Sequence, residues 1–158
     1  MQDGERKIAI DLRERLQKQA EEGGALFFGV ADLAQAREFI VEQGGSFLSK
    51  YAFAVSIGYR LLDGAVDELE KHEDSRAAST YWYHIYQVVN HRLDSIALDI
   101  AQEVQQLGHR ATVVPSSYTI DTTSLTGRFS HKLAAHLAGL GWIGKSALLF
   151  RVSEPFRY

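Results

Sequence analysis

A run of apolar side chains at helical spacing over residues 74–107 constrains the fold more than any other feature of the sequence. Its members follow one another at intervals of three or four residues, which places them on one face of an α-helix. They are Trp82, Ile85, Val89, Leu93, Ile96, Ile100, Val104 and Leu107. Gly108 follows directly and is a typical helix end. We therefore expect one long helix with a single buried face.

The rest of the chain alternates shorter helical patterns with apolar runs that are typical of strands. Helices are expected over residues 8–22, 33–43 and 131–138, each followed by glycine. Strands are expected over residues 25–30, 52–59, 111–115 and 146–152. In the second strand, large side chains alternate with small ones, which predicts close packing on the small face. Together these elements predict a single α/β domain over residues 1–158, α+β-like, with a mixed β-sheet of at least four strands and flanking helices.

Composition excludes several kinds of chemistry within these 158 residues. There is no cysteine, so the chain supplies no iron–sulfur ligand, disulfide, thiolate zinc site or cysteine nucleophile. Seventeen Lys and Arg against twenty Asp and Glu give a net charge of -3, without the basic excess of a nonspecific nucleic-acid binder. The N-terminus is polar, and the apolar runs fall far short of the roughly 20 residues that span a bilayer. We expect a cytoplasmic protein with no membrane partner.

The string Gly-Leu-Gly-Trp-Ile-Gly-Lys-Ser over residues 139–146 matches two phosphate-binding patterns. It satisfies the phosphate loop, G-x-x-x-x-G-K-S/T, and its first six residues satisfy the dinucleotide pattern G-x-G-x-x-G. Both patterns hold phosphate when a strand enters the loop and a helix leaves it. Here the expected order is reversed, which disfavours nucleotide binding. Two interpretations are left: a glycine-rich helix end with a turn, or a ligand-contacting loop to which Lys145 adds a cation.

The six histidines do not form a recognisable metal site. No two of them are four residues apart, the usual spacing of zinc ligands on one helix, and no metal is predicted. His84 lies within the aromatic stretch Tyr-Trp-Tyr-His-Ile-Tyr over residues 81–86. These rings cannot all face the core from one helix, so some must be exposed or cover a ligand.

Several stretches together resemble the N-terminal domain of the epoxyqueuosine reductase family. The most specific is Ala-Gly-Leu-Gly-Trp-Ile-Gly-Lys over residues 138–145, preceded by Ser-His-Lys over 130–132. Weaker pieces agree in order and spacing: Gly-Val-Ala-Asp over 29–32, Ser-Ile-Gly over 56–58, the stretch 83–94, and Gly108, Ala111, Pro115 and Ser116. The resemblance covers nearly the whole chain.

The resemblance implies a function as well as a fold. Such proteins carry an α/β domain that shares a cobalamin pocket with a C-terminal ferredoxin-like module, which holds 4Fe–4S clusters. The reductase itself converts epoxyqueuosine in tRNA to queuosine. This chain would be the cobalamin-binding portion of an oxidoreductase, completed by an iron–sulfur module in cis or in trans that is absent from these residues. The alternative is a non-catalytic binding or interaction module that retains the fold without redox chemistry.

The resemblance also implies site residues. His84 takes the position of a proton-donating aspartate in the reductase, and imidazole can donate a proton at neutral pH. That replacement, with the acidic net charge, makes tRNA a doubtful partner. The expected contacts to cobalamin converge on one concave face at strand ends, with a core position as the alternative for Trp142. They are Tyr83, Ser117, Tyr118, Ser130, His131, Lys132, Gly141, Trp142, Ile143, Gly144 and Lys145.

Overall fold

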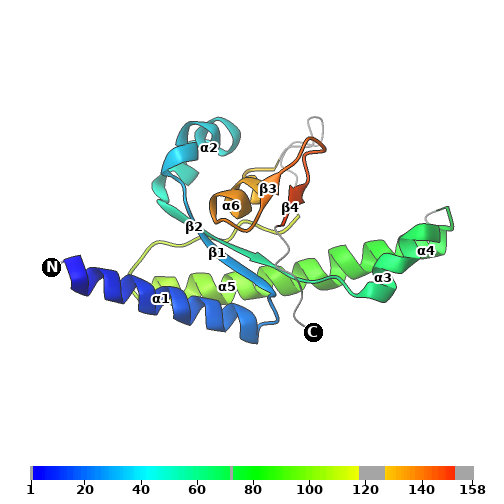
Figure 1. The fold of residues 1–158 in the computed structure, drawn as a ribbon, viewed down its shortest axis with the longest axis horizontal. Helices are drawn as coiled ribbons and strands as arrows, with labels where there is room; N and C mark the ends of the chain where they lie inside the picture. Colours follow the sequence, from blue (N-terminus) through cyan, green and yellow to red (C-terminus); the bar gives the residue numbers. More distant parts are fainter. Residues whose placement is uncertain (1, 72, 118–126, 152–158) are drawn as a thin grey trace.

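The computed structural model describes residues 2–71, 73–117 and 127–151, and it consists largely of helices around a small sheet (Figure 1). Helix α1 (Gln2–Glu22) lies beside helix α5 (Asn90–Gln106). The strands are β1 (Phe27–Asp32), β2 (Phe53–Gly58), β3 (Trp142–Ile143) and β4 (Leu149–Phe150). The other helical segments are η1 (Ala34–Ala36), α2 (Arg37–Gly44), η2 (Leu48–Lys50), α3 (Asp63–Asp67), η3 (Glu68–Lys71), α4 (Ser75–Trp82), η4 (Tyr83–Val89) and α6 (His131–Leu137).

The antiparallel pair β1–β2 forms the middle layer of the molecule. Phe28 lies opposite Ile57 in the register, and Ala31 lies opposite Ala54. Because successive strand residues point to opposite faces, the two large side chains share one face and the two alanines share the other. Helices α1 and α5 cover the first face, and α6 packs against the second (Figure 1).

The core on the large face joins the two longest helices to the sheet. Its buried members come from α1, α5 and the turn before β1, with Phe28 and Ile57 packed against them: Leu16, Ala20, Ala25, Ile96 and Ile100. At Gly23, where α1 ends, an added Cβ would lie 2.6 Å from Cγ1 of Ile96. An ion pair between Arg15 and Glu103, 2.5 Å apart, links the same helices at the surface.

The core on the small face joins α2, η2 and α6 to the sheet. Ala31, Leu33, Ile40 and Leu48 are buried there, and Leu133, Leu137 and Ala138 pack against them. A Cβ added at Gly29 would lie 2.8 Å from Cβ of Ala138, so only glycine allows this approach of α6. Ala54 of the second expected strand packs against the same core, and α6 contacts β2 as well as β1, so the close packing predicted for the small face of that strand is confirmed.

The segment expected to be one long α-helix is helical from Ser75 to Gln106, but its middle is not α-helical. Residues 83–89, which include part of the aromatic stretch, form the π-helical segment η4 between α4 and α5. The apolar periodicity is realised most fully in α5, where Ile96 and Ile100 are buried. Gly108, with φ of +84°, follows the end of α5.

The expected mixed sheet of at least four strands is wrong. More than half of the residues that the structure describes are helical, and the strands among them form two separate two-stranded antiparallel sheets. Residues 111–115 form no strand: Pro115 has no N–H to donate, and the next N–H, of Ser116, donates to the Asp94 carboxylate. In the expected strand 146–152, the described residues pair only through Leu149 and Phe150, and they pair with the glycine string itself.

Among the described residues, no helix has both the length and the apolar character that a membrane-spanning segment requires.

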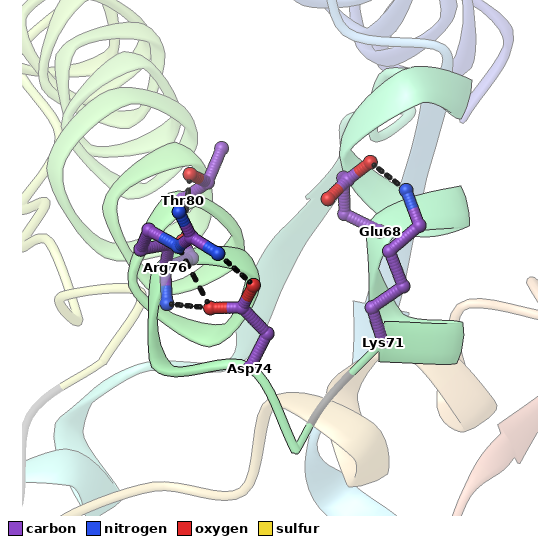
Figure 2. Close-up of polar contacts among 5 residues, drawn as sticks. All are labelled: Glu68, Lys71, Asp74, Arg76 and Thr80. Atoms are coloured by element: carbon purple, nitrogen blue, oxygen red, sulfur yellow. Dashed lines mark hydrogen bonds and ion pairs between the residues drawn. The ribbon is translucent and has the colours of Figure 1, made fainter.

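Helix α4 begins at an acidic cap (Figure 2). The Asp74 carboxylate accepts a hydrogen bond from the Arg76 backbone N–H, 2.9 Å away, and two more from the Arg76 guanidinium at 3.1 and 2.8 Å. These hydrogen bonds hold the pKa of the Asp74 carboxyl below its ordinary value of 3.8, and the side-chain bonds contribute more to this shift than the backbone bond.

Replacing Ile96 tests the packing between α1 and α5. Ile96 is 2% exposed, whereas Leu98 on the same helix is 50% exposed. We expect Ile96→Ala to lower the free energy of unfolding by about 2–5 kcal/mol through lost contacts and a residual cavity. Leu98→Ala should change it by no more than about 0.5 kcal/mol. Urea denaturation followed by far-UV circular dichroism measures both, and equal losses would contradict this packing.

Asp74 gives a prediction with a definite pH dependence. Its pKa is lower in the folded chain than in the unfolded one. The ionised carboxylate therefore stabilises the fold above pH 3.8, and that contribution is lost as the pH falls through the folded-state pKa. Asp74→Asn keeps a capping side chain but cannot ionise, so its melting temperature should be lower than wild type at about pH 6 and converge with it in acid. A gap that widens in acid would contradict the assignment.

Candidate functional site

The structure places the predicted site residues in two groups. Ser117 and the residues of 130–132 and 141–145 lie around α6 and the hairpin formed by β3 and β4. Tyr83 and His84 lie in η4, on the long helical run. Tyr118 lies outside the described residues.

Hydrogen bonds tie the first turn of α6 to the start of α5. Ser130 caps α6, and its Oγ accepts from the Leu133 N–H at 3.2 Å, as expected of a residue at this position. His131 Nε2 donates to the Pro115 carbonyl at 2.9 Å. The next residue, Ser116, donates from its N–H to Asp94 and from its Oγ to the Asn90 carbonyl, at 2.8 and 3.3 Å. Ser117 follows and is exposed.

Two side chains of α6 hold the hairpin at both of its ends. Lys132 Nζ donates to the Ala147 carbonyl in the turn, at 2.7 Å. His136 Nδ1 donates to the Gly141 carbonyl at the base, at 3.0 Å. The strands pair Trp142 with Phe150 and Ile143 with Leu149. The orientation of the hairpin is therefore set by α6.

The glycine string forms a helix end followed by a hairpin strand. Gly139, with φ of +74°, lies in the left-handed region after α6, which is the conformation that favours glycine. A Cβ on Gly141 would overlap the carbonyl oxygen of Phe150, and one on Gly144 would lie 2.5 Å from its ring. A helix precedes the string and strands follow it, so the context that a phosphate loop requires is not present.

The hairpin exposes a stacked pair of aromatic side chains. The rings of Trp142 and Phe150 lie 6.1 Å apart at an interplanar angle of 23°. Trp142 is 48% exposed and Phe150 43% exposed, so the alternative of a core position for Trp142 is wrong. Ile143 and Leu148 are also exposed. Sequence reasoning missed Phe150 and Leu148 as members of this surface, although the expected strand over residues 146–152 contained both.

Segment η4, which carries Tyr83 and His84, contacts Leu62, α4 and α5. His84 Nε2 accepts a hydrogen bond from the Leu62 N–H at 3.3 Å, at the start of α3. Tyr83 is exposed, and its neighbours Trp82 and Tyr86 stack at 5.8 Å. Segment η4 packs against α4 and α5, whereas α6 packs against β1, β2, β3 and β4. Hydrogen bonds thus join the segment that ends at Ser117 to α6 and the hairpin, and the convergence of Tyr83 and His84 with them stays a prediction.

No group of three or more metal-ligating side chains gathers anywhere in the described part of the chain. Comparisons of the chain with protein-family models, with curated proteins and with solved structures find no match. The functional assignment therefore depends on the residues and on their geometry.

Substitution of Gly141 tests the geometry of the hairpin. We expect Gly141→Ala to lower the melting temperature, because its Cβ would overlap the backbone of Phe150. Gly64, on α3, has open space around the position of a Cβ, and alanine favours a helix over glycine by up to about 1 kcal/mol. Gly64→Ala should therefore leave the melting temperature unchanged or raise it. An unchanged melting temperature for Gly141→Ala would show that the hairpin is not packed as described.

Proposed function

We propose that this chain is the cobalamin-binding portion of an iron–sulfur oxidoreductase similar to the epoxyqueuosine reductases, and that the β3–β4 hairpin contacts the corrin ring. The observation that carries the proposal is the exposed Trp142–Phe150 stack. A planar ligand binds well against aromatic and apolar side chains whose positions are already fixed. Here Lys132 and His136 fix them through bonds to hairpin carbonyls.

The residues of the hairpin fit one wall of a corrin site. Trp142 and Phe150 offer an exposed apolar surface against which a flat ring can lie, and Ile143 is exposed on the other face of the hairpin. Ser117 and Lys145 are exposed beside α6 and at the turn, and both can donate hydrogen bonds to the amide arms of the ring. His131 and Lys132 donate to backbone carbonyls and so support this wall, and the Lys132 ammonium keeps two further N–H donors for the ligand.

Cobalamin supplies a redox-active cobalt when bound. The chain has no cysteine, so the electrons would come from clusters in a ferredoxin-type module, in cis or in trans. Its own residues bind and orient the ring. If His84 donates a proton, the proton leaves Nδ1, because Nε2 of the neutral ring accepts the Leu62 N–H.

One observation favours the alternative of a binding module without redox chemistry. The hydrogen bond from Leu62 to His84 gives the imidazole a structural role at the start of α3. A histidine retained for that bond needs no substrate. The hairpin would then bind a flat ligand or a partner, and no proton would be transferred.

Tryptophan fluorescence tests the cobalamin proposal at the hairpin itself. The chain has two tryptophans, so Trp142 is the only one left in Trp82→Phe. Cobalamin absorbs where tryptophan emits, and a ring bound near Trp142 must quench it by energy transfer. We expect saturable quenching by hydroxocobalamin, and a rise in melting temperature because the ligand binds the folded state.

Controls distinguish cobalamin binding at Trp142 from absorption of the emitted light and from binding elsewhere on the chain. Free N-acetyltryptophanamide corrects for absorption of the emitted light. Trp142→Ala should lose the rise in melting temperature, whereas Phe39→Ala, which removes an exposed ring on α2, should keep it. Quenching without saturation, or stabilisation by ATP alone, would contradict the proposal.

A further inference from the structure

Residues 60–71 and 73–86 belong to a largely helical arm in which Asp and Glu outnumber Lys and Arg. The arm comprises α3, η3, α4 and the start of η4, and α3 and α4 lie at one end of the long helical run (Figure 1). It contains six Asp and Glu but only three Lys and Arg. All three cations are paired within the arm: Arg60 with Asp63 at 2.9 Å, Lys71 with Glu68 at 2.9 Å, and Arg76 with Asp74 at 2.8 Å (Figure 2 shows the last two).

Three carboxylates of the arm take no part in these ion pairs. Asp67, Glu70 and Glu73 are exposed and form no ion pair with any residue that the structure describes. Large apolar side chains are exposed on the same arm, some of them more than half: Leu62 65%, Val66 40%, Trp82 52%, Tyr83 61% and Tyr86 44%. Such a combination of apolar area and like charge is typical of a surface that binds an oppositely charged partner.

A second surface has the same kind of apolar exposure with the opposite charge. We call α6 and the β3–β4 hairpin, with the residues that flank them, the basic face. Its cations are Arg128, Lys132, Lys145 and Arg151, and residues 127–151 contain no Asp or Glu. None of these four cations forms an ion pair in the described part of the chain. Trp142, Ile143, Leu148 and Phe150 are exposed on the hairpin.

In the part of the chain that the structure describes, the arm and the basic face pack against different elements. Segment η3 packs against α3 and α4, and α6 packs against the sheets. Among the described residues of a single copy, no ion pair joins the excess charge of one surface to that of the other, although the chain carries both halves of a complementary pair. A partner that matches each surface in charge and in apolar character is thus a second copy of this chain.

We propose that the arm of one copy docks on the basic face of a second copy, and that the exchange is reciprocal. A reciprocal contact has two-fold symmetry and closes as a dimer, whereas a one-way contact would continue into a filament. The dimer would pair Asp67, Glu70 and Glu73 with the cations of the partner's basic face. It would also cover the exposed aromatic side chains of the arm.

The dimer has a consequence for the cofactor site, and this consequence alone rests on the proposed function. The hairpin supplies one wall, and an arm docked beside it would bring exposed aromatic side chains from the other copy to the opposite wall. Tyr83 would then approach the hairpin of the partner rather than that of its own chain.

Sedimentation velocity without cobalamin tests the dimer. The wild-type chain should sediment as a dimer at about 20 mM salt, and its dissociation constant should rise at least tenfold at about 500 mM, where the Debye length falls from roughly 20 Å to about 4 Å. Glu70→Lys/Glu73→Lys in the arm, or Arg128→Glu/Lys145→Glu in the basic face, should each give monomers. All four substitutions are at exposed positions, and far-UV circular dichroism confirms that the variants compared are folded.

The decisive experiment mixes the two variants whose surface charges are reversed. The first variant then has a basic arm as well as a basic face, and the second keeps its acidic arm beside a face with no net charge. Only the mixture offers an acidic arm together with an intact basic face, so it should recover the association that neither variant shows alone. A monomeric wild type, association that strengthens in high salt, or a mixture of folded variants that stays monomeric would overturn the proposal. Because cobalamin is absent, these outcomes are independent of the fluorescence test at Trp142.

Discussion

The close approach of α6 to the small face of β1–β2 is the contact on which the rest of the structure depends. Gly29 leaves no room for a side chain under Ala138, and Ala31 and Ala54 continue the flat surface along both strands. Since the opposite face carries Phe28 and Ile57, the same two strands also hold α1 and α5 in place. A two-stranded sheet is marginal by itself, and here helices on both faces stabilise it.

The position of the candidate site follows from that contact. Once α6 is seated on the sheet, Lys132 and His136 reach the turn and the base of the hairpin, and His131 reaches Pro115. Each of these three side chains donates a hydrogen bond to a backbone carbonyl. The groups left exposed are the stacked rings, Ser117 and Lys145, which suit a flat ligand with polar substituents.

Local patterns in the sequence predicted the parts of the fold that depend on one element at a time. Periodicity located Ile96 and Ile100 in the core, alternation located the small face of β2, and Ser130 was expected to cap α6. The number and pairing of strands depend on partners distant in sequence. Residues 111–115 have the composition of a strand, but Asp94 takes the Ser116 N–H, and the glycine string pairs with residues that were expected to join a larger sheet. Neither event leaves a local signal. The resemblance places Tyr83 and His84 beside the hairpin, which stays a prediction, and the structure adds the hydrogen bond from Leu62 to His84, which no sequence pattern indicated.

Hydrogen–deuterium exchange with and without hydroxocobalamin tests most directly whether α6 and the hairpin form the functional surface. Exchange reports local opening of the backbone, and a bound ligand slows it where it makes contact. The account predicts added protection in β3, β4 and the first turn of α6, with α1 and the C-terminal half of α5 unchanged. Protection confined to α1 and α5, or none at saturating ligand, would contradict it.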